Sequence, residues 1–180
     1  MCAVLSSWQG GCSRFANGDR MEITMLDKAL ITRADDFGSS HSANQAIYEV
    51  SKKGIVKNVS VMACAPYLEE AAEMLASSKD VTFGMHSVIN AEWDRVVWGP
   101  VAPKEKVKSL IDHRGVFYQD VLELAAAKPD LDEIITEYKY QLERLRKVGF
   151  PIAYIDSHMM PEGDIPGLAE NLTGGWRKRG

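Results

Sequence analysis

Segments with the period of a strand alternate along this chain with segments that have the period of a helix, and this order constrains the fold most. Short runs rich in β-branched and aromatic residues come before longer runs with apolar residues at helical spacing. This order predicts a parallel sheet with right-handed crossovers, in either an α/β barrel or a doubly wound fold. We expect strands at residues 28–34, 55–64, 81–85 and 152–156, and helices at residues 41–53, 67–77, 119–127 and 131–148.

The stretch between residues 87 and 118 interrupts the alternation. It contains Trp93, Trp98 and two prolines, and only a short helix near residues 104–111 fits its pattern. A connection this long inside a compact domain is usually functional or disordered. We expect an ordered loop in which Trp93 and Trp98 face a substrate, with packing as the alternative explanation for both side chains.

Two adjacent carboxylates, Asp35 and Asp36, follow the first predicted strand. Successive strand side chains point to opposite faces, and like charges this close repel each other, so the pair is costly to place. A cation or a catalytic task offsets that cost. The alternative is a turn and helix-cap pair, because Asp is favoured in both positions.

The other residues suited to chemistry also fall where predicted strands end. His86 follows the third strand, and His158 follows the fourth through Asp156 and Ser157. In both candidate folds, functional sites lie at the carboxyl ends of the parallel strands. Asp36, His86 and His158 are therefore predicted to bind a divalent metal, since two imidazoles and a carboxylate are a known ligand set. Asp35 would then be available as a general base toward water.

Each histidine also has an ordinary interpretation, because a single His at a strand end is more often a boundary residue without a function. His41 and His113 are assigned to that class. The joint placement of Asp36, His86 and His158 favours one site over three coincidences.

Bulk properties exclude several other classes of function. With 180 residues the chain can bury one core, and its net charge of −4 gives no basic surface for nucleic acid. No apolar run reaches the length of a membrane helix. The cysteines lack paired metal-ligand spacing, so we expect a cytoplasmic protein. Residues 1–26 are predicted to be a flexible extension that precedes one domain at residues 27–180.

An ordered series of short motifs resembles the YdjC family, the carbohydrate deacetylase or chitooligosaccharide deacetylase-like proteins. The resemblance extends from about residue 28 to residue 158, which is most of the chain. The motifs are Ala34-Asp35-Asp36-Phe37-Gly38, Asn44 with Ile47, Gly54-Ile55-Val56, Ser60-Val61-Met62-Ala63, Gly84-Met85-His86, Gly115-Val116-Phe117, Glu137 with Gln141, and Ile155-Asp156-Ser157-His158.

The resemblance implies a (β/α)-barrel-like fold with parallel strands and a hydrolase that removes N-acetyl groups from acetylated amino sugars. It implies a divalent cofactor, Mg²⁺ or Zn²⁺, held by Asp36, His86 and His158, with Asp35 as the catalytic base. The implied partner is a small acetylated sugar, without nucleic acid or membrane.

Two features depart from the family pattern. Met160 stands where the family usually has a second histidine, two residues after His158. The chain is also shorter than family members, and its Gly-rich, basic ending supplies no further strand. We therefore expect an incomplete barrel, because the chain ends early. Because such a barrel has open sheet edges, we expect that a homodimer stabilises it or that it is only marginally folded.

Two other functions remain open on the sequence. One is a non-catalytic protein that retains metal or sugar binding through the loop of Trp93 and Trp98. The other is a different metal-dependent hydrolase on a similar barrel, such as a phosphoesterase, which is weaker because no Gly-rich phosphate loop is present.

Overall fold

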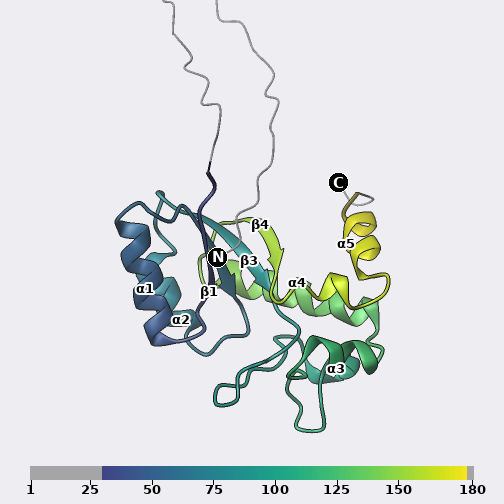
Figure 1. Cartoon of the computed structure of the whole chain (residues 1–180). Helices are drawn as coiled ribbons and strands as arrows, with labels where there is room; N and C mark the ends of the chain where they lie inside the picture. The colour runs from purple at the N-terminus through teal and green to yellow at the C-terminus, as the bar shows by residue number, and fades with distance from the viewer. Residues whose placement is uncertain (1–29, 178–180) are drawn as a thin grey trace, which may run out of the picture.

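Four parallel strands form one sheet in the order β1-β2-β3-β4 in the computed structural model, which describes residues 30–177 (Figure 1). Each strand therefore lies beside its neighbour in sequence, whereas a doubly wound sheet reverses its order partway. Within residues 30–177, β1 and β4 each pair with one strand, so the sheet is open. The predicted α/β fold with parallel strands is confirmed. The strands are β1 Arg33–Phe37, β2 Asn58–Met62, β3 Thr82–Ser87 and β4 Ile152–Ser157.

Helices connect the strands and cover one face of the sheet. Ser40 begins the first helix as its N-cap, accepting a hydrogen bond from the Ala43 backbone N–H. The longest helix, α4, packs against β3 and β4, and α1 packs against β1 and α2. The α-helices are α1 His41–Lys52, α2 Leu68–Leu75, α3 Val121–Ala126, α4 Leu131–Lys147 and α5 Leu168–Arg177; the 3₁₀ helices are η1 Lys104–Lys106, η2 Lys108–Leu110 and η3 Pro161–Gly163.

The two faces of the sheet differ in character because strand side chains alternate. On the helix-covered face, the ring of Phe83 lies 5.1 Å from that of Phe150, which lies 6.2 Å from Phe37. All three rings are fully buried. The opposite face is polar, and its side chains converge toward the carboxyl edge of the sheet. This polar face carries Ser60, His86, Tyr154 and Asp156.

The structure corrects the bounds of the strand predicted at residues 28–34. Pairing with β2 begins only at Arg33, opposite Asn58, and residues 28 and 29 lie outside the described residues. Leu30 and Ile31 are 76% and 60% exposed. Apolar composition was misleading here, because Leu30 and Ile31 pair with no strand among residues 30–177. The predicted extension, residues 1–26, also lies outside the described residues.

Two further differences concern helices. The predicted helix at residues 104–111 forms as two short 3₁₀ segments, η1 and η2, separated by the buried Val107, whose φ of −141° and ψ of 40° are not helical. Helix α5 was not expected from the Gly-rich ending. Among residues 30–177, none of the helices combines the length and apolar character that crossing a membrane requires.

The long loop after β3 is held in place by two buried side chains of α4. The carboxylate of Glu137 accepts hydrogen bonds from the backbone N–H groups of Val101 and Ala102, at 2.9 and 3.0 Å. The amide of Gln141 bonds both backbone groups of Val88, at 3.1 and 2.6 Å. Burial raises the pKa of Glu137, although these donors oppose the shift. The loop is therefore ordered, as the sequence predicts.

Substitution of Gly84 is expected to destabilise the sheet. A Cβ at this position would lie 2.1 Å from Cε2 of Tyr154, so the ring must move and its hydroxyl loses the 3.1 Å contact with Ser60. We expect Gly84→Ala to cost about 1–3 kcal/mol in free energy of unfolding, measured by urea denaturation. The control is Gly163→Ala, because nothing lies within 4 Å of a Cβ there. Equal midpoints for the two variants would contradict the prediction.

Candidate metal centre

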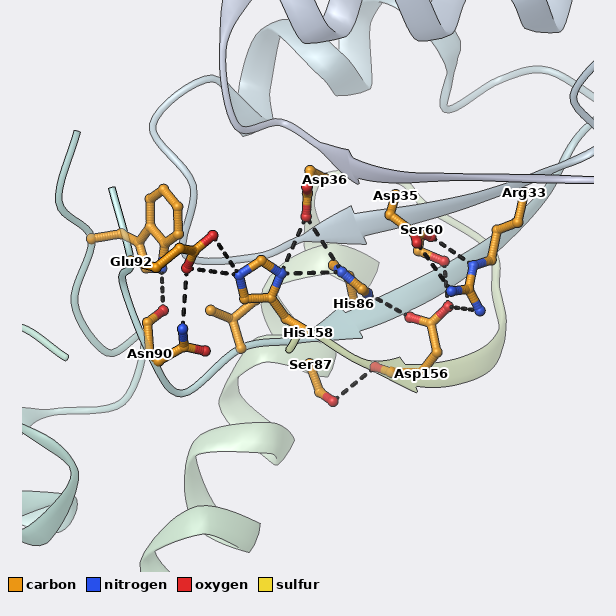
Figure 2. A network of polar contacts seen from close by, with 12 residues as sticks. Arg33, Asp35, Asp36, Ser60, His86, Ser87, Asn90, Glu92, Asp156 and His158 are labelled. Atoms are coloured by element: carbon orange, nitrogen blue, oxygen red, sulfur yellow. Dashed lines mark hydrogen bonds and ion pairs between the residues drawn. The ribbon is translucent and has the colours of Figure 1, made fainter. Parts of the chain in front are cut away.

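Three side chains from different strand ends meet at the carboxyl edge of the sheet (Figure 2). Asp36 comes from β1, His86 from β3, and His158 directly follows β4. Oδ1 of Asp36 lies 3.3 Å from Nε2 of His86 and 3.2 Å from Nδ1 of His158. The two ring nitrogens lie 3.3 Å apart. The structure thus brings together the three predicted metal ligands as a nearly equilateral triangle of donor atoms.

A bulge in β1 separates the two adjacent carboxylates. The register with β2 shifts between Ala34 and Phe37, and Asp36 has a φ of +65°. Asp is one of the few residues that tolerate this left-handed conformation, and bulges redirect side chains next to active sites. As a result Asp36 faces the histidines, whereas Asp35 faces Arg33. The alternation of strand side chains made this pair awkward to place, and the bulge is the structural solution.

The triangle of donor atoms fits a tetrahedral cation. Metal–ligand bonds of 2.0–2.1 Å place tetrahedral ligand atoms about 3.3–3.4 Å apart, close to the observed edges, whereas octahedral ligands at that bond length lie about 2.9 Å apart. Oδ1 of Asp36 is buried and accepts no well-aligned hydrogen bond from the protein. A buried carboxylate oxygen without such a partner is costly. A cation bound by Asp36, His86 and His158 would satisfy that oxygen.

In each histidine, the ring nitrogen that faces away from the triangle contacts a second carboxylate. Nδ1 of His86 lies 2.7 Å from Oδ1 of Asp156, and Nε2 of His158 lies 2.9 Å from Oε2 of Glu92. The pKa values of Asp156 and Glu92 are both lowered, because hydrogen bonds from the histidines outweigh the effect of burial. Ionised carboxylates only accept, so these ring nitrogens donate. Nε2 of His86 and Nδ1 of His158 are thereby directed toward the centre, as in carboxylate–histidine–metal arrangements.

The metal-free centre is strongly polarised. Burial raises the pKa of the Asp36 carboxyl, but the imidazoles of His158 and His86 outweigh it and hold that pKa far below its usual range. Burial lowers the pKa of His158, but the carboxylates of Asp36 and Glu92 prevail and raise it to about 9. The pKa of His86 is also raised, because Asp156 and Asp36 outweigh burial. These shifts favour a protonated His158 beside an ionised Asp36.

Asp35, the predicted catalytic base, lies beside this centre. Its carboxylate receives two hydrogen bonds from Arg33, at 2.6 Å from Nε and 3.0 Å from Nη2. Its side chain is 40% exposed. Asp35 thus lies next to the centre and open to solvent, with its orientation fixed by an arginine.

The two predicted substrate-binding tryptophans differ in exposure. Trp98 is 3% exposed, donates its indole N–H to the backbone oxygen of Asn90, and lies 6.3 Å from the His158 ring. Trp93 is half-buried, and its ring packs edge-on against Trp98 at 5.3 Å. Both belong to the loop that approaches the triangle of Asp36, His86 and His158. Met160 is 71% exposed and lies outside the donor triangle.

The sequence argument gave no role to Glu92, Asp156 or Arg33. A signal existed for Asp156, because it lies two residues before His158 at the end of the fourth predicted strand. In the structure, Asp156 lies directly opposite His86 in the β3–β4 register. Glu92 had no such signal, because it lies in an irregular loop. Its placement depends on the folded path of that loop and on Asn90, whose side-chain amide donates to it at 3.1 Å.

Loss of the outer carboxylate of His158 is expected to weaken metal binding. Glu92→Ala removes the acceptor that orients the ring, and outer partners of this kind contribute about 10–100-fold in affinity. We expect that loss in Zn²⁺ titrations by calorimetry, with a smaller loss for Glu92→Gln. Asp94→Asn is the matched control, because Asp94 is exposed in the same loop and accepts from Gln119. Equal affinities in Glu92→Ala and the control would refute the role.

Comparison with known proteins gives consistent relatives. Carbohydrate deacetylases of Thermoanaerobacter pseudethanolicus and Enterococcus faecalis are each 33% identical over 73% and 74% of this chain, and over 50% and 49% of their own lengths. A chitooligosaccharide deacetylase of Yersinia pestis is 32% identical over 76% of this chain and 53% of its own length. The chain spans about half the length of the curated relatives it matches.

A solved structure shares the fold. The crystal structure of an Enterococcus faecalis V583 protein to which cellobiose-phosphate cleavage has been ascribed superposes with a TM-score of 0.71 and 30% sequence identity. The match covers 82% of this chain and 55% of that protein. Residues 29–179 match the family model described as YdjC-like protein. Because this match covers most of the sequence, the chain belongs to the YdjC-like family.

Proposed function

We propose that this chain carries the metal centre of a metal-dependent hydrolase that removes N-acetyl groups from acetylated amino sugars, including chitooligosaccharides. The observation that carries the proposal is the triangle of Asp36, His86 and His158, with its buried carboxylate oxygen that lacks an aligned donor. The relatives named as carbohydrate and chitooligosaccharide deacetylases support the choice of substrate.

The proposed cofactor is a divalent cation, with the donor spacing favouring Zn²⁺ over Mg²⁺. When bound, it supplies Lewis-acid chemistry that polarises an amide carbonyl and makes water more acidic. Asp36, His86 and His158 hold it, and Asp156 and Glu92 keep the two rings oriented. Water reaches the centre from the side of Asp36, whose side chain is 37% exposed.

Asp35 is the proposed catalytic base. It is a carboxylate beside the centre, open to solvent and held in one orientation by Arg33. In this role it takes the proton of the attacking water, and a general acid must then protonate the departing amine. Glu137 does not fill the second role, since its side chain is fully buried and accepts from Val101, Ala102 and Gln141.

Trp93 and Trp98 are the proposed substrate contacts. Ligand sites are lined largely by aromatic and apolar side chains, and these two rings stand beside His158. Trp93 has the more accessible ring, whereas the buried Trp98 supports both Trp93 and His158.

We further propose a homodimer, because β1 and β4 are both open sheet edges within the described residues. Light scattering after size exclusion tests it.

Acetate release from N,N′-diacetylchitobiose by the 180-residue chain tests the proposed activity. We expect turnover with Zn²⁺ that a chelator abolishes and added metal restores. Cellobiose phosphate serves as the competing substrate, because that cleavage has been ascribed to the structural relative. Metal binding without acetate release would reduce the proposal to a binding protein, and turnover of the phosphate ester alone would replace it.

A further inference from the structure

A second set of potential metal ligands lies beside the donor triangle. Ligand atoms of Asp35, His86 and Asp156 all lie within 4.8 Å of one another. Asp156 shares His86 with the triangle, through Nδ1 of the ring. The hydroxyl of Ser60 adds another oxygen, 2.6 Å from Oδ2 of Asp156. Because Nδ1 of His86 carries the proton that it donates to Asp156, two carboxylates and a hydroxyl remain as ligands. These oxygens resemble a cation site in every respect except one.

The exception is Arg33, whose guanidinium lies between the two carboxylates (Figure 2). Its Nε and Nη2 bind the two oxygens of Asp35, and its Nη1 lies 2.8 Å from Oδ2 of Asp156. The guanidinium thus contacts both acidic members of the second set with its planar fork. Arginine stays charged at any physiological pH, so the positive charge here is permanent.

We propose that Arg33 is a positioning residue that keeps a cation out of the Asp35–Asp156 set and so keeps Asp35 uncoordinated. This inference rests on the proposed metal centre at Asp36, His86 and His158. A carboxylate that binds a metal has committed the lone pair that a general base needs. The single positive charge of Arg33 offsets part of the negative charge of the two carboxylates, and its hydrogen bonds leave Asp35 exposed to solvent.

The position of Arg33 explains why one arginine serves both carboxylates. It lies two residues before Asp35 on β1, so both side chains extend from the same face of the strand. Asp156 reaches this point from β4, across the two intervening strands. The carboxylate of Asp156 therefore has three side-chain partners: Arg33 and Ser60 on Oδ2, and His86 on Oδ1.

The stoichiometry of metal binding tests this role independently of activity. We expect the parent chain to bind one Zn²⁺ per chain in calorimetric titration and in metal analysis after dialysis. Arg33→Gln is expected to show a second, weaker binding event and to approach two ions per chain. Arg33→Lys, which retains the charge, and Arg146→Gln, at an exposed arginine of α4, are expected to bind one. Arg33→Gln combined with Asp35→Asn is expected to return to one ion.

The outcomes separate this inference from the proposed function. A parent chain that binds no metal would remove the proposed function itself. A parent chain that binds one ion, beside an Arg33→Gln variant that also binds only one, would overturn the role of Arg33. If circular dichroism shows that Arg33→Gln does not fold, the Zn²⁺ stoichiometry of the parent chain provides the test. A second ion bound by the parent chain at excess Zn²⁺, with Arg33 in place, would also overturn the role of Arg33.

Discussion

His86→Ala and His158→Ala are expected to lose nearly all metal binding while keeping the fold. Each substitution removes one of three donor atoms from a triangle whose edges are 3.2–3.3 Å. The loss should exceed the roughly 10–100-fold that an outer partner contributes, because a ligand itself is removed. The measurement is Zn²⁺ affinity by calorimetry together with metal content after purification. Acetate release should fall to the level of the chelated protein.

The matched control is His113→Ala, since His113 is exposed in the loop before Gly115 and belongs to neither ligand set. It should bind Zn²⁺ as the parent does. Circular dichroism of all three variants separates loss of a ligand from loss of the fold. If His86→Ala and His158→Ala bind as tightly as His113→Ala, the ligand assignment is wrong.

The meeting of Asp36, His86 and His158 could be predicted from sequence because parallel strands share one carboxyl edge. Once three strands are recognised, the residues at their ends must lie near one another, however long the chain between them. His86 and His158 are 72 residues apart, yet their ring nitrogens lie 3.3 Å apart. This inference needed only element order and strand ends, which are the features that sequence periodicity reveals best.

The partners of these residues could not be predicted in the same way. Glu92 reaches His158 from an irregular loop whose path depends on buried contacts with Glu137 and Gln141. The bulge at Asp36 depends on how β1 meets β2, which no periodicity encodes. Likewise, Leu30 and Ile31 resemble part of a strand but pair with no strand in the part of the chain that the structure describes. Side-chain networks and strand limits follow from tertiary contacts, so they become visible only in the structure.

Zn²⁺ affinity is expected to rise steeply between pH 6 and pH 8. The pKa of His158 is raised from its ordinary value of 6.5 to about 9 in the metal-free protein, by Asp36 and Glu92 acting against burial. Its Nδ1 must lose that proton before it can bind a cation. Each pH unit below 9 then lowers the apparent affinity about tenfold for one released proton, which is about 100-fold between pH 8 and pH 6.

The same proton affects stability in the opposite direction. Because the folded pKa of His158 lies above its unfolded value, the metal-free protein gains stability that is complete below pH 6.5 and is lost as pH rises through 9. Raising the pH should therefore lower the stability of the metal-free protein toward urea, while it strengthens Zn²⁺ binding.

Calorimetry in two buffers of different ionisation enthalpy counts the protons that Zn²⁺ binding releases. In Glu92→Gln one carboxylate that raises this pKa is gone, so both pH dependences should become shallower. Affinity that is independent of pH would show that no proton occupies the centre, and the electrostatic account of His158 would then be wrong.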